Sequence, residues 1–142
     1  MDLIKQAGPP FLQLSPQLWG QMVSDVSQRA PQEACGLVAG TGNTGLAVYP
    51  LINILHSTTE YQIDPQEQFH IFQLIEENGW ELLAIYHSHP NGPPKLSSRD
   101  IAEAFYPQAV YLVWYRSGEE WHCKGFSIRS QEPEEIAIRI KG

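Results

Sequence analysis

The chain has 142 residues, of which 42% are hydrophobic and 11% aromatic, enough apolar material for one domain with its own core. Sixteen acidic residues outnumber nine basic ones, and the net charge of -7 argues against a nucleic-acid partner, because phosphate binding needs a basic face. No apolar run approaches the roughly 18 residues that a membrane span needs, and Met1–Gly8 lacks the apolar stretch of a signal peptide. We therefore expect a soluble, cytoplasmic protein that binds neither nucleic acid nor membrane.

Cys35 and Cys123 are the only cysteines, and no Cys-x-x-Cys pair is present to hold a structural zinc ion. We expect both thiols to be reduced and partly buried, although the sequence leaves a disulfide between them open. No linker or internal repeat divides the chain. The sequence therefore predicts a single domain over residues 1–142, with a core at about 11–130 and a C-terminal strand or tail at 131–142.

The first predicted helix follows a short alternating strand at 11–14. Ser15 is its N-cap and Pro16 its first residue, a pair that is typical of helix starts. Apolar side chains then recur at a spacing of four residues, which indicates one buried stripe. The stripe is formed by Leu18, Met22 and Val26. The helix is expected to end near Ala30.

Two further helices are predicted later in the chain. Asp64 caps the second, with Pro65 at its first position. Its expected buried face is formed by Phe69, Phe72, Leu74 and Ile75. The third helix is short, at 97–105. Its inward side chains are expected to be Ile101, Ala104 and Phe105.

Alternation and short apolar runs predict the strands. The expected strands are 11–14, 33–40, 46–51, 81–86, 109–115, 120–128 and 134–140. A turn at 41–45 makes the second and third of these a hairpin, and the last alternates in the manner of an edge strand. The sum is an α/β (α+β) fold, a single-domain mixed β-sheet flanked by helices.

The candidate functional site lies at the end of the strand predicted over 81–86. His87 and His89 are two residues apart in this strand-like run, so their imidazoles point to the same face, whereas Ser88 points to the other and should be structural. Asp100 follows after a loop that contains Gly92, Pro93 and Pro94, which can return its carboxylate to the same point. Two histidines and one carboxylate form a three-ligand set with an open position, the composition of a catalytic zinc site.

Other interpretations of these residues compete with the zinc site. The histidines could be ordinary surface residues, and Ser97-x-x-Asp100 is also a capping box, whose use would compete with metal binding by Asp100. Two histidines and a carboxylate also describe the iron(II) site of oxygenases, but His-x-His followed by a nearby Asp favours zinc. A zinc deaminase is excluded, because its Pro-Cys-x-x-Cys motif is absent.

A hydrolase also needs a base that takes a proton from the metal-bound water. Glu33 is the candidate because it stands at the head of the apolar run 33–40, where an acid is unexpected. Taken alone, the local sequence favours a simpler role for Glu33, as a capping or hairpin-end carboxylate.

Three segments together resemble the signature of the JAMM (MPN-plus) metalloproteases. They are Glu33-Ala34-Cys35-Gly36-Leu37, His87-Ser88-His89-Pro90 and Ser97-x-x-Asp100. In that signature a Glu on an early strand is followed by His-Ser/Thr-His-Pro. Seven residues, counted from the Pro, separate the second His from a Ser, and two more separate this Ser from an Asp; this chain matches each position. The resemblance spans roughly residues 11–114 in element order. It implies the JAMM/MPN architecture, which is cytidine-deaminase-like.

The resemblance also implies a role for each matched residue. The zinc ligands would be His87, His89 and Asp100, with one zinc ion per chain. Glu33 would act as general base and acid, and Ser97 would hydrogen-bond the oxyanion of the tetrahedral intermediate.

Members of this family cut peptide or isopeptide bonds after the C-terminal Gly-Gly tail of ubiquitin or ubiquitin-like proteins, with the tail in a groove beside the metal. The chain resembles the small prokaryotic members, which act on ubiquitin-like sulfur carriers, since it has no long insertion after Asp100. A sulfur-carrier protein is therefore the implied partner and substrate. The polar segment 53–63 is the candidate groove wall, with Asn53 and Tyr61 as candidate contacts to the tail.

Two alternative functions stay open on the sequence. A non-catalytic MPN scaffold would bind protein partners, but scaffold members typically lose a ligand or the Glu, and all five positions are kept here. Domains of phage-tail assembly proteins and of the RadC-type family share the His-x-His-Pro pattern, so another substrate is the second alternative. The sequence fixes neither the leaving group nor the oligomeric state, for which a homodimer is one option.

Overall fold

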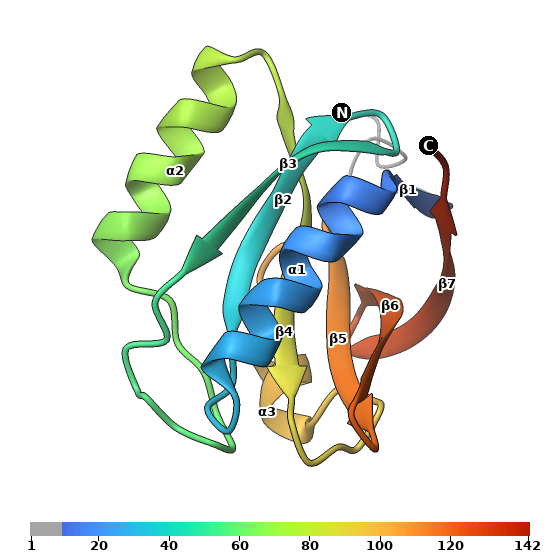
Figure 1. Ribbon diagram of the computed structural model, residues 1–142. Helices are drawn as coiled ribbons and strands as arrows, with labels where there is room; N and C mark the ends of the chain where they lie inside the picture. Colours follow the sequence, from blue (N-terminus) through green and yellow to red (C-terminus); the bar gives the residue numbers. More distant parts are fainter. Residues whose placement is uncertain (1–9) are drawn as a thin grey trace.

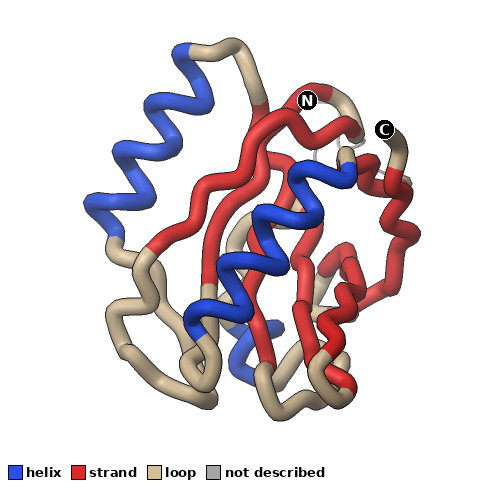
Figure 2. Tube along the Cα trace, in the orientation of Figure 1, coloured by secondary structure: helices blue, strands red, loops and turns tan. Residues whose placement is uncertain are grey.

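The computed structural model describes residues 10–142, so the expectation about Met1–Gly8 lies outside the described residues. Figures 1 and 2 show the arrangement of its helices and strands. In chain order the elements are β1 (Phe11–Leu14), α1 (Pro16–Arg29), β2 (Cys35–Thr41), β3 (Thr44–Leu51), α2 (Pro65–Glu77), β4 (Glu81–His89), α3 (Ser98–Ala102), β5 (Val110–Ser117), β6 (Glu120–Arg129) and β7 (Glu132–Ile140). Within the described range, no helix combines the length and the apolar character needed to cross a bilayer.

The strands form one mixed sheet that closes on itself, in the order β1-β3-β2-β4-β5-β6-β7. β7 closes it, because β7 pairs antiparallel with β6 and parallel with β1, where Phe11 lies opposite Ala137. β1 meets β3 through the single pair Gln13 and Thr44. The predicted mixed α/β class is confirmed. The sheet, predicted as flanked by helices, is over the described residues a closed seven-stranded sheet with three helices. The prediction that the last strand is an edge strand is wrong, because β7 pairs on both sides.

The alternation in β7 has a different cause from the one expected. Ile136 and Ile138 pack against the core cluster that α1 also covers, while Glu135, Ala137 and Arg139, on the other face of the strand, are exposed. A strand with one wet face has this pattern whether or not its hydrogen-bonding edge is free, because alternation reports the two faces and not the edges.

Apolar clusters lie on both faces of the sheet. α1 crosses one face, in front of the strands in Figure 1, and its buried residues join a cluster that includes Tyr86 and Trp114. α2 and α3 contribute to the other cluster, through Phe72 of α2 and Ile101 of α3. The metal-ligand candidates lie on this second face, so the two later helices and their connecting segments form the walls of the site.

The predictions for α1 and for the hairpin are confirmed. The Ser15 hydroxyl accepts a hydrogen bond from the Leu18 N–H at 3.1 Å, and Leu18, Met22 and Val26 are buried as expected. β2 and β3 pair antiparallel across a turn at Gly42, whose φ of +62° suits glycine.

α2 begins as predicted, with the Asp64 carboxylate accepting from the Gln66 N–H at 3.3 Å, but its buried face was partly misjudged. Ile75 is buried, and Ile71 and Phe72 pack against the cluster on the second face, to which α2 and α3 both contribute. Phe69, in contrast, is 63% exposed. At 100° per residue, Phe69 lies roughly 110° around the helix from the centre of that face.

α3 is shorter than predicted, since it ends at Ala102. Ile101 and Ala104 pack against the same cluster on the second face, as expected. Phe105 lies beyond the helix and is 74% exposed, so its predicted inward position is wrong. Cys35 and Cys123 are both free thiols, the first buried and the second partly buried.

Candidate metal centre

β4 delivers both histidines from the middle of the sheet. It pairs antiparallel with β2, where His87 lies opposite Cys35, and parallel with β5, where His89 lies opposite Tyr115. The strand continues through His89, so its alternation turns His87 and His89 to the same face. Both side chains are buried, with His87 fully covered.

The ligand atoms predicted for zinc converge. His87 Nε2 lies 3.0 Å from His89 Nε2 and 3.1 Å from Asp100 Oδ2, and His89 Nε2 lies 3.3 Å from the same oxygen. Zinc–nitrogen bonds of about 2.0–2.1 Å in a tetrahedral site separate two ligand atoms by about 3.3 Å. The donor types and their separations therefore fit a single zinc ion.

The backbone fixes which nitrogen of His89 faces the cluster. His89 Nδ1 lies 2.8 Å from the carbonyl oxygen of Pro93. A carbonyl only accepts, so Nδ1 carries the proton and the lone pair of Nε2 points to the shared centre. The loop after β4 thereby orients a ligand ring.

Asp100 caps α3 and at the same time faces the two histidines, although the sequence alone predicts capping and metal binding by this residue as competing roles. Its Oδ2 accepts a hydrogen bond from the Ser97 N–H at 2.8 Å, which completes the capping box of α3, and the same oxygen faces both histidines. Burial alone would raise the pKa of Asp100, but hydrogen bonds with His87 and His89 and with the Ser97 amide hold it far below the usual value. The cap therefore orients the carboxylate toward the centre.

Glu33 lies just before β2, outside the three-atom set. Its Oε2 is 4.0 Å from His89 Nε2, and its carboxylate, His87 and His89 offer ligand atoms that all lie within 4.8 Å of one another. Burial raises the pKa of Glu33 to about 7, and the charges of Asp100 and Glu60 act in the same direction. A carboxyl group with such a pKa exchanges protons readily near neutral pH.

Two buried polar side chains hold the chain around Glu33. The Ser88 hydroxyl accepts from the Ala34 N–H at 2.8 Å, and Asn53 Nδ2 donates to the Glu33 carbonyl at 3.0 Å. Ser88 thus has the structural role predicted for it. Neither contact was predicted from sequence, since each joins segments far apart in the chain.

Asn53 differs from the predicted groove contact. It is 2% exposed, and its amide makes four hydrogen bonds within the chain. Nδ2 donates to the carbonyls of Glu33 and Glu60, and Oδ1 accepts from the N–H groups of Leu55 and Gln62. This uses the full capacity of the amide. Asn53 therefore organises the 53–63 segment and has no group left to offer a peptide.

Tyr61 lies against the metal-ligand set. Its ring stacks on that of His87, with centroids 4.5 Å apart and planes inclined by 20°. Burial raises the pKa of the Tyr61 hydroxyl well above its usual value. The contact restrains the His87 ring and makes Tyr61 the wall of the centre on the side of the 53–63 segment.

Ser97 sits at the solvent side of the cluster. Its Oγ accepts from the Asp100 N–H at 3.0 Å, which leaves the hydroxyl proton free to donate. The side chain is exposed, so a ligand can reach it.

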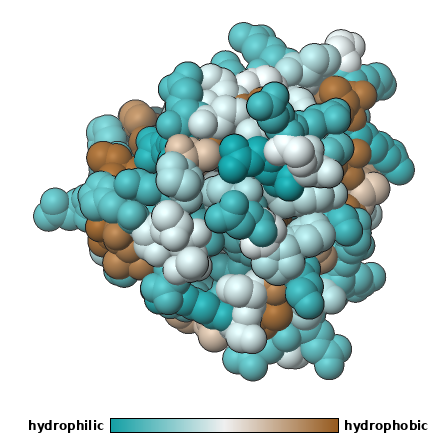
Figure 3. All heavy atoms as spheres, turned by 60° about the horizontal axis from the view of Figure 1, so that its bottom comes forward, coloured by the Kyte–Doolittle hydropathy of each residue, from teal (hydrophilic) through white to brown (hydrophobic). Residues whose placement is uncertain are grey.

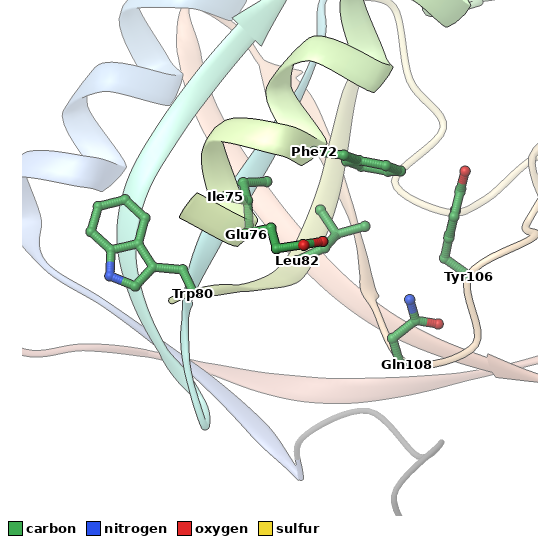
Figure 4. Close-up of a pocket in the computed structure, with 7 residues that line it drawn as sticks. All are labelled: Phe72, Ile75, Glu76, Trp80, Leu82, Tyr106 and Gln108. Atoms are coloured by element: carbon green, nitrogen blue, oxygen red, sulfur yellow. The ribbon is translucent and has the colours of Figure 1, made fainter. Parts of the chain in front are cut away.

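Two adjoining pockets lead away from the centre. The first, of about 160 Å³, has Tyr61 and Ile63 on one side and Phe105 and Tyr106 on the other. Tyr106 also lines the second, of about 280 Å³, in which side chains of α2 and β4 face Tyr106 and Gln108 (Figure 4). A hollowed strip therefore runs from the metal-ligand set along α2.

The end of the molecule at which β4 stops is mostly hydrophilic. Figure 3 turns this end forward and shows one group of hydrophobic side chains at the left, the side on which α2 and the 52–63 segment lie in Figure 1, and another at the upper right. The exposed large apolar residues include Ile52, Ile54, Leu55 and Phe69.

The closed mixed sheet and the cluster of two histidines, an aspartate and a glutamate on it are features of a known protein family, which a comparison with known sequences identifies. Residues 15–129 match the family described as prokaryotic homologs of the JAB domain. The chain belongs to this family, as the resemblance to JAMM/MPN proteins predicted.

Curated relatives come from archaea and bacteria. A desampylase of Haloferax volcanii is 35% identical over 98 residues, which are 64% of this chain and 70% of the relative. A probable TtuB-protein conjugate cleaving protease of Thermus thermophilus is 45% identical over 92 residues, 64% of this chain and 61% of the relative. A CysO-cysteine peptidase of Mycobacterium tuberculosis is 28% identical over 113 residues, 78% of this chain and 77% of the relative.

Solved structures share the fold. The solution structure of protein DSY2949 from Desulfitobacterium hafniense superposes with a TM-score of 0.82 at 32% identity and covers 92% of each chain. AF2198, a JAB1/MPN domain protein from Archaeoglobus fulgidus, superposes with a TM-score of 0.60 at 14% identity, over 92% of this chain and 97% of that one. The closed mixed sheet with its helices is therefore the JAB/MPN fold.

Proposed function

We propose that this protein is a zinc-dependent peptidase or isopeptidase that hydrolyses the bond after the C-terminal Gly-Gly tail of a ubiquitin-like sulfur carrier. The observation that carries the proposal is the convergence of His87 Nε2, His89 Nε2 and Asp100 Oδ2 within 3.3 Å, with the Glu33 carboxylate 4.0 Å from His89. Relatives that act on such conjugates, judged by their names, support the substrate class.

The three converging atoms would hold the metal. Zinc, when bound there, supplies a Lewis acid that polarises the scissile carbonyl and lowers the pKa of water. The Pro93 carbonyl keeps His89 in the ligating tautomer, the Ser97 amide orients the Asp100 carboxylate, and the Tyr61 ring restrains His87. These contacts exist before any substrate arrives, so the ligand set is preorganised.

Glu33 would move the proton. Its carboxylate lies 4.0 Å from the nearest ligand nitrogen, so it stands outside the closer contacts of the three ligand atoms. At this distance it can hydrogen-bond a water molecule that lies to one side and is held by the metal. Glu33 Oε2 would accept a proton from the attacking water and then donate it to the leaving amine. Ser88 and Asn53 hold the backbone at Glu33 in place: the Ser88 hydroxyl accepts from the Ala34 N–H, and the Asn53 amide donates to the Glu33 carbonyl.

Ser97 would stabilise the developing charge. Its hydroxyl oxygen already accepts from the Asp100 N–H, so the hydroxyl proton is directed elsewhere and is available to an oxyanion. The role requires only that the scissile carbonyl lie on the α3 side of the ligand set.

The carrier tail would approach along the hollowed strip beside α2. The pocket between the 61–63 segment and Phe105–Tyr106 adjoins the ligand set through Tyr61, and its walls are largely apolar or aromatic. An extended tail with an apolar residue upstream of its glycines would fill this pocket, while the glycines pass the ligand set.

The test is incubation of the zinc-loaded protein with a sulfur-carrier protein that carries a short peptide after Gly-Gly, read by intact mass spectrometry. We expect release of the peptide with a carrier product ending in Gly-Gly, and no release by the Glu33→Gln variant. Cleavage elsewhere, or equal cleavage by Glu33→Gln, would contradict the proposal. A lysine-linked conjugate of the same carrier distinguishes isopeptidase from peptidase activity.

A further inference from the structure

An ion pair links the two walls of the metal centre. Arg99 Nη1 of α3 donates to Glu60 Oε2 of the 53–63 segment across 2.6 Å. The guanidinium also contacts Glu103, the C-cap of α3, where Arg99 Nε and Glu103 Oε1 are 3.2 Å apart. The contact with Glu60 joins two segments that are separated by 39 positions in the sequence.

Both partners are anchored to the centre on opposite sides. The Glu60 carbonyl accepts from Asn53 Nδ2, the same amide nitrogen that donates to the Glu33 carbonyl, and the next residue, Tyr61, stacks on His87. Arg99 directly precedes Asp100, whose Oδ2 faces the histidines. The ion pair therefore runs from the Glu33 and Tyr61 side of the cluster to the Asp100 side.

The pair lies on the solvent side of a nearly closed site. The side chains of the cluster are at most 8% exposed, whereas those of Arg99 and Glu60 are 38% and 46% exposed. A peptide bond must reach the cluster from solvent. The structure thus combines a covered centre with an exposed polar contact that spans its two walls.

We infer that the Glu60–Arg99 ion pair is a removable bridge over the entrance to the metal centre and limits the residue beside the scissile bond to glycine. This inference rests on the proposed function for its substrate. Exposed ion pairs contribute little stability, so a side chain on the tail can displace the bridge, but only at the small cost of breaking that pair. A glycine brings no side chain against the bridge, whereas an alanine places a methyl group in the same space.

The test compares two carrier substrates that differ only in the last residue before the cleaved bond, glycine or alanine. Arg99→Met and Glu60→Gln each break the bridge. We expect the ratio of kcat/KM for the alanine tail to that for the glycine tail to rise about threefold to fivefold in each, the size an exposed pair supplies. Taking a ratio within one enzyme cancels any effect of the lost charge on Glu33.

Two controls separate the bridge from charge and stability. Glu103→Gln removes the other carboxylate that contacts Arg99 but leaves the bridge, and it should keep the wild-type ratio. The charge-reversed double variant, Glu60→Arg with Arg99→Glu, should return the ratio toward wild type. A second readout needs no substrate: zinc transfer from the loaded protein to EDTA should be faster in Arg99→Met and Glu60→Gln than in wild type and Glu103→Gln.

Unchanged ratios and unchanged zinc-transfer rates in both bridge variants would overturn the inference while leaving the proposed function intact, provided the glycine tail is still cleaved. Failure of the wild type to cleave any tail would instead contradict the proposed function. In that case the zinc-transfer rates still decide whether the pair covers the centre, and equal rates would overturn the bridge.

Discussion

The Ser88 hydroxyl and the Ala34 amide form a buried hydrogen bond of 2.8 Å between β4 and the residue next to Glu33. A second bond, from the Ser88 N–H to the Ala34 carbonyl at 3.1 Å, joins the same two residues. The side chain that lies between His87 and His89 thus anchors the residue next to Glu33, the proposed general base, from the opposite face of the strand.

Ser88→Ala should destabilise the protein and slow turnover. The Ala34 N–H would lose its side-chain acceptor in a buried site, at a cost of about 1–3 kcal/mol. Chemical denaturation gives the change in the free energy of unfolding. Ser24→Ala, which removes an exposed hydroxyl bonded to Gln28, should change it by less than about 0.5 kcal/mol. Equal stability of Ser88→Ala and Ser24→Ala would contradict the role given to Ser88.

Asn53→Ala should cost more stability than any other single change in the 53–63 segment. It leaves two carbonyls and two N–H groups without their partner, each worth on the order of 1 kcal/mol or more where water cannot replace it. Turnover should fall with it, because the Glu33 carbonyl loses its anchor. Asn78→Ala, which removes one exposed hydrogen bond to the Leu74 carbonyl, is the matched control and should be nearly neutral. A neutral Asn53→Ala would mean that the segment is held by other contacts.

Gly36→Ala and Gly20→Ala should shift stability in opposite directions. A methyl group at Gly36 would lie 2.3 Å from Cε2 of the buried Tyr86 ring, whose hydroxyl is held by Asp25 at 2.7 Å. Such overpacking costs about 1–3 kcal/mol. Gly20 lies exposed within α1 with no atom near the added carbon, so alanine there should stabilise by about 0.5–1 kcal/mol. Thermal unfolding midpoints that move in the same direction for both variants would rule out this account.

Ser97→Ala tests whether the hydroxyl is more than a helix cap. Loss of the cap on α3 should cost about 1 kcal/mol, and loss of an oxyanion donor should lower kcat by about 10²-fold. Ser15→Ala removes the equivalent cap of α1, far from the site in sequence, and should have a similar stability cost with unchanged kcat. If the two variants lower stability equally and neither lowers kcat, Ser97 is only a cap.

Much of this molecule could be predicted from local sequence. Caps at Ser15 and Asp64 located two helix starts, and the His-x-His spacing on β4 placed two imidazoles on one face. Local patterns act within a few residues, which is why these predictions succeeded. The prediction that Phe69 is buried failed, because adjacent apolar residues do not tell which side of a helix meets the sheet.

What sequence could not supply were contacts between distant segments. Closure of the sheet by β7 depends on pairing with β1 at the other end of the chain, and alternation cannot reveal it. Asn53 looked like a groove residue because it is polar within a polar loop, yet it bonds to Glu33 and Glu60. From the sequence, capping and metal binding at Asp100 exclude each other. In the structure one oxygen both caps α3 and faces the histidines, since a carboxylate oxygen accepts more than one contact.

The central claim is that His87, His89 and Asp100 hold one zinc ion while Glu33 moves the proton. The most direct measurement is zinc content and turnover for the wild type, Glu33→Gln and His89→Ala, with the fold of each checked by circular dichroism. The account predicts about one zinc per chain in the wild type and in Glu33→Gln, a loss of about 10²-fold or more in turnover for Glu33→Gln, and loss of zinc in His89→Ala. A folded wild-type protein that binds no zinc, or a Glu33→Gln variant with full turnover, would contradict it.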